Sequence, residues 1–115
     1  MIKTTTQKFT YETYRSMIDE LLAENKTTGE NHSEDMIGYT KMNVHRMSKW
    51  DKTVKLNEEL TSKISNLNKK LKLVTFSEAW CGDAAHNVPI IEKLAQASDN
   101  ISHELLLRDE NEEIF

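Results

Sequence analysis

The sequence has few of the residues that build disulfide-bonded or nucleotide-binding sites. It contains a single cysteine, a single proline and three glycines. One cysteine excludes an internal disulfide framework and is compatible with a reducing compartment, so we expect a cytoplasmic protein. Three glycines leave no glycine-rich loop that could hold phosphate groups, and no cofactor is predicted.

Long apolar runs and an excess of positive charge are also absent. No segment approaches the roughly 20 apolar residues that a membrane span needs, and residues 1–8 lack the apolar core of a signal peptide. The net charge is −4, whereas nucleic-acid binding needs an organised positive surface. We therefore predict one compact domain that binds neither nucleic acid nor membrane.

The single cysteine, Cys81, lies between two segments of different periodicity. Residues 71–76 form a short apolar and β-branched run, which predicts a buried strand. Beyond the cysteine, apolar residues recur at steps of three and four, which predicts a helix over residues 83–97. Unpaired N–H groups and the helix dipole favour a thiolate at such a strand-to-helix turn. Cys81 is therefore the candidate nucleophile, although a small buried apolar residue is the alternative interpretation.

The residues around Cys81 resemble a known family. Residues 74–84 read V-T-F-S-E-A-W-C-G-D-A, and Pro89 follows the cysteine by eight residues. This segment resembles the active-site strand and helix of the thioredoxin superfamily, in which W-C-x-x-C is followed by a kinking proline at that spacing. The similarity is softer elsewhere. Residues 25–29, 39–43 and 51–53 resemble bacterial members of the family that have a helical N-terminal extension. Residues 105–111 resemble the family's next strand.

The resemblance implies a thiol–disulfide oxidoreductase with Cys81 as its catalytic residue. Its substrates would be proteins or low-molecular-weight thiols and disulfides, which would contact Trp80, Gly82, Asp83 and Ala84. Trp80 is nearly as well explained as a core residue. Asp83 is a favourable acid at a helix N-terminus, although its charge opposes thiolate formation.

The sequence departs from the family pattern at two positions. Ala84 stands where the family has its resolving cysteine, so no internal disulfide can close. Thr75, six residues before Cys81, replaces the buried aspartate that helps to deprotonate that second thiol. Thr75 and Pro89 are assigned structural roles, since the proline removes a backbone donor and should kink the helix. At best, then, we expect a monothiol reaction in which an external thiol resolves the mixed disulfide.

The domain organisation follows from the same comparison. Residues 1–70 predict a helical N-terminal extension, with one helix from Thr10 to about Asn25 and a second after Ser33 that breaks near residues 51–55. Residues 71–115 predict a partial β-α-β unit, ending with the first turn of another helix over residues 111–115. The fold class is α/β, an incomplete thioredoxin-like fold, because the sequence stops before the family's cis-proline loop and last two strands.

This incompleteness has a consequence for strand 71–76. In the thioredoxin arrangement a further strand flanks it, and without that strand one edge is a template for association. We therefore expect a homodimer through this edge, unless the N-terminal helices cover it. The second functional hypothesis is accordingly a redox-inactive fragment or interaction module. No metal is predicted, since the four histidines and Cys81 show no zinc-binding spacing.

Overall fold

The computed structural model describes residues 7–114, which form helices first and a parallel β-α-β unit after them. This is the α/β arrangement that the sequence predicted. In chain order the elements are α1 (Tyr11–Ala23), α2 (Glu34–Thr53), α3 (Glu58–Ser65), β1 (Leu71–Ser77), α4 (Gly82–Gln96), β2 (Ile101–Leu107) and the 3₁₀ segment η1 (Arg108–Ile114).

The start of α1 is fixed by local contacts that the sequence predicted. The Thr10 side chain accepts a hydrogen bond from the Thr13 N–H at 3.1 Å, and its own N–H donates to the Thr13 hydroxyl at 2.9 Å. Phe9 and Tyr14 pack edge to face with their ring centres 6.2 Å apart. This capping box and hydrophobic staple satisfy first-turn N–H groups and set the direction in which the chain enters the helix.

The helical region after Ser33 divides into two helices, as predicted. Ser33 caps α2, which ends at Thr53 within the interval where a break was expected. Asn57 then caps α3 by accepting a hydrogen bond from the Leu60 N–H at 2.7 Å. α3 contains no buried residue. Its stability therefore depends more on its caps and ends than on core packing.

The β-α-β unit also forms where it was predicted, with each boundary within one residue of the expected position. β1 and β2 pair in parallel, with Leu71 opposite Ile101 and Ser77 opposite Leu107. α4 connects the end of one strand to the start of the other, as parallel pairing requires. Pro89 is buried inside α4, and the helix continues past it to Gln96. The kink expected at Pro89 stays a prediction.

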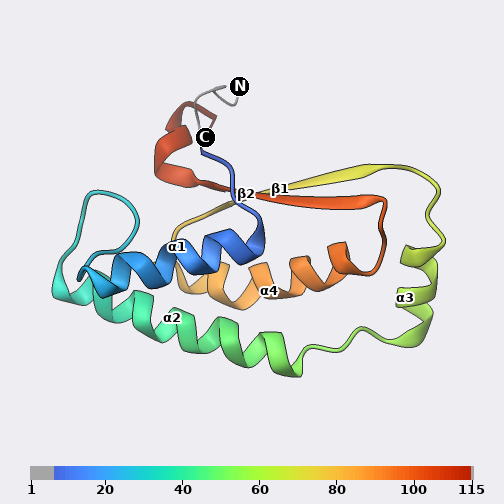
Figure 1. The fold of residues 1–115 in the computed structure, drawn as a ribbon, viewed down its shortest axis with the longest axis horizontal. Helices are drawn as coiled ribbons and strands as arrows, with labels where there is room; N and C mark the ends of the chain where they lie inside the picture. Colours follow the sequence, from blue (N-terminus) through green and yellow to red (C-terminus); the bar gives the residue numbers. More distant parts are fainter. Residues whose placement is uncertain (1–6, 115) are drawn as a thin grey trace.

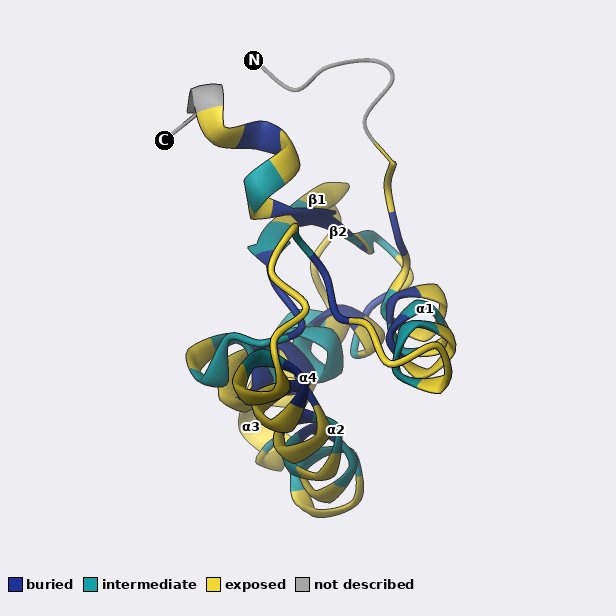
Figure 2. Cartoon of the chain, turned by 90° about the vertical axis from the view of Figure 1, so that its left-hand side faces the viewer, coloured by how far each residue is buried: buried dark blue, intermediate teal, exposed yellow. Residues whose placement is uncertain are grey.

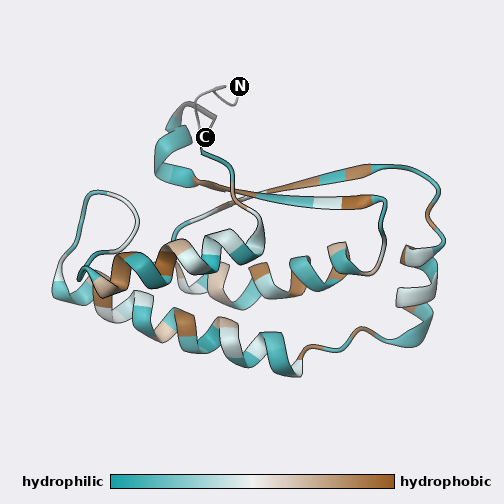
Figure 3. Cartoon of the chain, viewed as in Figure 1, coloured by the Kyte–Doolittle hydropathy of each residue, from teal (hydrophilic) through white to brown (hydrophobic). Residues whose placement is uncertain are grey.

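Helices cover one face of the two-stranded sheet (Figure 1). α4 packs against both strands and against α2, while α1 packs against β2 and α2. Figure 2 shows buried segments where the strands and helices face each other, and Figure 3 shows hydrophobic residues along both strands. α1, α2 and the β-α-β unit share one hydrophobic core, whose buried members are Phe9, Tyr14, Ile18, Met47, Ala79, Ala85, Val88, Leu105 and Leu107.

The prediction that residues 71–76 form a buried strand was wrong about burial, although the strand exists. Leu71 is 44% exposed and Val74 is 37% exposed, and only Ser77 at the end of β1 is fully buried. The reason is that helices pack on one side of the sheet only. Within residues 7–114, β2 is the only strand that pairs with β1, whereas the other side of β2 forms an antiparallel bridge from Leu105 to Phe9.

The C-terminal segment differs from the expected α-helical turn over residues 111–115. η1 begins earlier, at Arg108, and has 3₁₀ geometry with a non-helical residue at Asn111. Phe115 lies outside the described residues. Among the helices of the described chain, none combines the length and the apolar character needed to cross a bilayer.

Candidate functional site

Cys81 occupies the position that the sequence predicted, at the junction between β1 and α4. It is the N-cap residue of α4, with extended backbone angles and no capping hydrogen bond from its side chain. Its N–H donates to the Glu78 carbonyl at 3.0 Å, and its carbonyl accepts from the Ala85 N–H at 3.2 Å. The thiol is free and half-buried. A cysteine at a helix N-terminus with partial exposure is in the kind of environment where protein thiols react.

The loop before Cys81 is fixed by hydrogen bonds to both backbone groups of Ala79, a residue that is only 2% exposed. The Ala79 N–H donates to the Thr28 hydroxyl at 2.9 Å, and the Asn43 side-chain amide donates to the Ala79 carbonyl at 3.0 Å. Thr28 comes from the loop after α1, and Asn43 comes from the middle of α2. The N-terminal helical region thus fixes the backbone that presents Cys81.

Arg46 brings a positive charge to the start of α4. Its guanidinium donates to the Asn43 side-chain carbonyl at 2.9 Å. One of its nitrogens lies 3.1 Å from the point where a Cβ on Gly82 would sit. Because Gly82, the residue after Cys81, has no side chain, the guanidinium can pack directly against its backbone. A cation near a cysteine is a second feature of reactive thiol sites.

Trp80, the residue before Cys81, contacts the C-terminal segment. The Arg108 guanidinium sits over its indole ring, 5.3 Å from the ring centre, within the range of a cation–π contact. Its Nε1 atom is 3.6 Å from the Cβ position of Gly29, whose φ is +82°. Trp80 is half-buried, so it is neither a plain core residue nor a freely exposed one.

Asp83 and Ala84 point to different environments. Asp83 is exposed in the first turn of α4, where a carboxylate interacts favourably with the helix dipole. Ala84 is half-buried and packs against the core. Ala84, the position where the resemblance predicts a resolving cysteine in the family, is thus a small apolar contact in this structure.

Thr75 is part of a polar chain across the covered face of the sheet. Its hydroxyl lies 2.7 Å from His103 Nε2, and His103 Nδ1 lies 3.0 Å from a Glu92 carboxylate oxygen. These contacts satisfy both nitrogens of a histidine whose side chain is only 2% exposed. They give Thr75 a structural partner that sequence reasoning did not find.

Tyr14 places a buried hydroxyl near the site. The hydroxyl is 2.7 Å from the Ser77 hydroxyl at the end of β1. Burial raises the pKa of Tyr14 above its usual value. The Ser77 hydrogen bond offsets part of the rise, and negative charge at Glu78 adds to it. The phenol therefore stays protonated.

Glu78 is the least expected member of the site. It is only 2% exposed, and one carboxylate oxygen accepts the Asp109 N–H at 3.1 Å. The other oxygen, Oε1, is buried without a hydrogen-bond partner. Burial raises the pKa of the Glu78 carboxyl and the Asp109 charge adds to the rise. The hydrogen bond from the Asp109 N–H, a side-chain hydrogen bond from Thr28 and the Arg108 charge counter it.

Sequence reasoning missed the residues that position the site from a distance. Asn43 interrupts the apolar face of α2 and is 1% exposed, and such a polar residue on a buried face was the available signal. Thr28 lies within residues 25–29, which the softer family similarity covers, but neither Thr28 nor Arg46 was assigned a contact, because their contacts depend on how three segments pack together. Within the described residues, no three His, Cys, Asp or Glu side chains are grouped so that they could hold a metal ion.

Comparison with known proteins gives one positive result. The family described as thioredoxin matches residues 29–115, a range that includes α2, Cys81 and the whole β-α-β unit. Searches of curated proteins and of solved structures found no match. Because the match covers more than half of the sequence and contains the parallel β-α-β unit described above, the chain belongs to the thioredoxin family.

Proposed function

We propose that the protein carries out thiol–disulfide exchange with Cys81 as its single reactive thiol. The observation that carries the proposal is the placement of Cys81 as the half-buried N-cap of α4. The Arg46 guanidinium, next to Gly82, adds a positive charge at the start of the same helix. Membership of the thioredoxin family supports the same chemistry.

The proposed reaction has two exchange steps. The Cys81 thiolate attacks one sulfur of a disulfide and forms a mixed disulfide, while the other sulfur leaves as a thiolate that takes up a proton. An external thiolate such as glutathione then attacks the substrate sulfur of the mixed disulfide and releases Cys81. Each step forms one S–S bond and breaks one, so the external thiol is the only reductant required.

Ala84 and the single cysteine of the sequence support resolution from outside the protein. No second thiol of this chain is available to close an internal disulfide. A compartment rich in reduced thiols would supply the resolving group, and the bacterial cytoplasm is the compartment that we propose.

The experiment follows the reduction of a glutathionylated protein by reduced glutathione. The wild-type chain should accelerate the reduction above the uncatalysed rate, and a mixed disulfide at Cys81 should be seen by intact mass. Cys81→Ser should give only the uncatalysed rate, because the serine hydroxyl cannot exchange with a disulfide.

A matched control moves the thiol from the N-terminus of α4 to the C-terminus of α3. In the double variant Cys81→Ser with Ser65→Cys, the thiol lies at the exposed C-terminus of α3, where the helix dipole has the opposite sign. This variant should be slower than the wild type. Equal rates for the two proteins would show that any accessible thiol suffices, and no acceleration by the wild type would remove the proposal.

The exposed first half of β1 supports a second candidate, a redox-inactive interaction module. Within the described chain β1 has one strand neighbour, and Leu71 and Val74 are exposed. We propose that two copies associate through the edge of β1 at residues 71–74, since an exposed strand edge is a template for pairing. Sedimentation velocity over a range of concentrations should then show a dimer in rapid exchange with the monomer. A clean monomer throughout, with β1 amides exchanging fast, would exclude this association.

A further inference from the structure

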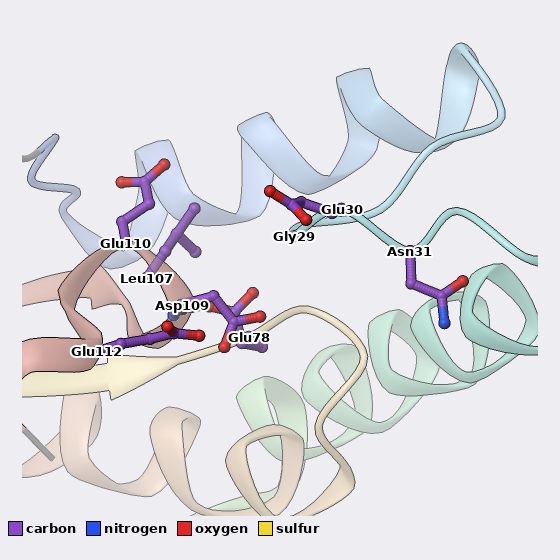
Figure 4. Close-up of a pocket in the computed structure, with 8 residues that line it drawn as sticks. All are labelled: Gly29, Glu30, Asn31, Glu78, Leu107, Asp109, Glu110 and Glu112. Atoms are coloured by element: carbon purple, nitrogen blue, oxygen red, sulfur yellow. Dashed lines mark hydrogen bonds between the residues drawn. The ribbon is translucent and has the colours of Figure 1, made fainter.

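A cavity of about 550 Å³ lies between the loop after α1, the end of β1 and η1 (Figure 4). Five of its lining residues carry carboxylates: Glu30, Glu78, Asp109, Glu110 and Glu112. Its size is in the range of pockets that hold small ligands. A cluster of acids on a surface is common and does not define a site, so the argument depends on how two of these carboxylates are buried and oriented.

Glu78 is the first of them, and it lines the cavity although it is almost fully buried. Oε1 is buried without a hydrogen-bond partner, in a residue that is only 2% exposed. It lies 3.8 Å from the point where a Cβ on Gly29 would sit, and Gly29 also lines the cavity. A buried carboxylate oxygen without a donor is costly. A ligand that donates hydrogen bonds would remove that cost.

Asp109 directs a second oxygen to the same place. Its Oδ2 lies 3.2 Å from the same Gly29 Cβ position, while Oδ1 is engaged by the Arg108 guanidinium. Figure 4 shows the Glu78 and Asp109 side chains next to each other at the cavity. The absence of a side chain at Gly29 leaves this space open. Two carboxylate oxygens therefore converge on one small volume.

The charge around this volume is poorly balanced. Among the described residues that contact Glu78 and Asp109, Arg108 is the cation, and it already donates to Asp109 and covers the Trp80 ring. The raised pKa of Glu78 agrees with a carboxylate that lacks compensation. A metal ion is a poor match, because no group of three potential ligands in residues 7–114 has the required proximity. An organic cation with several N–H donors satisfies both oxygens better.

We propose that this cavity binds a guanidinium group, either from an arginine side chain of a peptide or from a small free guanidine. A guanidinium is planar and carries five N–H donors in a fixed fork, which suits two converging carboxylate oxygens. The Trp80 Nε1 atom lies 3.6 Å from the same Gly29 Cβ position, so the indole N–H can report when the cavity is occupied. The site goes beyond the exchange reaction and does not require Cys81 to react.

The test uses NMR titration of the full chain, observed at the indole N–H of Trp80. N-acetyl-L-argininamide represents a peptide arginine, agmatine represents a free guanidine, and N-acetyl-L-citrullinamide is the uncharged isostere. We expect a saturable shift of the Trp80 signal with one or both guanidinium probes. The guanidinium probe that binds more tightly shows whether the natural ligand is a peptide arginine or a free guanidine. The citrulline probe should bind at least about tenfold more weakly, because it loses a charge-assisted hydrogen bond.

Variants test whether the carboxylates are responsible. Glu78→Gln keeps the size of the side chain and should weaken the guanidinium probe by about tenfold or more. Glu59→Gln, which removes the same charge from an exposed position in α3, should bind as the wild type does. If Glu78→Gln does not fold, Asp109→Asn should show the same loss. Binding of both probe types with equal strength, or unchanged binding in these variants, would overturn the proposal.

Discussion

Asn43→Ala is expected to lower the free energy of unfolding by about 1–3 kcal/mol, because it leaves buried polar groups without partners. The Asn43 amide donates to the Ala79 carbonyl, and its carbonyl accepts from Arg46. Both contacts support the backbone that leads into Cys81. Urea denaturation measures the stability. Hydrogen exchange at the Ala79 N–H, which donates to the Thr28 hydroxyl, should become faster as the loop loosens.

Asn87→Ala is the matched control for this substitution. Asn87 is exposed on α4, where its amide donates to the Asp83 carbonyl within the same helix. Alanine is a better helix former than asparagine, so this change should be close to neutral or slightly stabilising. If the two alanine variants had equal stability and equal exchange at Ala79, the proposed support of the Cys81 loop by α2 would be wrong.

Glu78→Gln is expected to change how the stability depends on pH. The folded-state pKa of Glu78 lies above its usual value of 4.5, so the folded state binds this proton more tightly than the unfolded state. The stabilisation from the protonated carboxyl is fully present below the usual pKa of about 4.5. It is lost as the pH rises through the raised pKa. Glutamine carries no such proton and avoids this loss.

The measurement compares urea denaturation of the wild type and Glu78→Gln at a series of pH values. The stability of the variant relative to the wild type should increase with pH in the window that begins near 4.5, by at most about 1.4 kcal/mol per pH unit. Glu59→Gln, at an exposed site, serves as the control and should show a much smaller change. A constant difference between wild type and Glu78→Gln across the series would contradict the assigned pKa shift.

The elements of the fold could be predicted because their signals are local. The Thr10 cap, the break after Thr53 and the change of periodicity on either side of Cys81 all lie within a few residues of the structure that they determine. The placement of Cys81 at a helix N-terminus followed from these signals alone. The burial of β1 did not, because it depends on which faces of the sheet the rest of the described chain covers.

The supporting residues of the site could not be predicted, since their contacts join segments that are distant in sequence. Thr28 and Asn43 meet at Ala79 only after α1 and α2 have packed. Likewise, Glu78 and Asp109 face Gly29 only when η1 folds back over the loop after α1. Neither residue spacing nor hydrophobic periodicity predicts contacts between segments that are distant in sequence. The unpaired oxygen of Glu78 is a property of the packed structure alone.

The most direct test of this account is the rate at which Cys81 reacts with a small disulfide reagent in the folded protein. The same measurement in denaturant gives the rate of the freely exposed thiol. Cys81 is a half-buried N-cap thiol, and the Arg46 guanidinium lies next to the following residue, Gly82. It should react in the folded state at least as fast as in the unfolded state, and faster than the thiol placed by Ser65→Cys in the Cys81→Ser background. Reaction of Cys81 only after global unfolding would contradict the account.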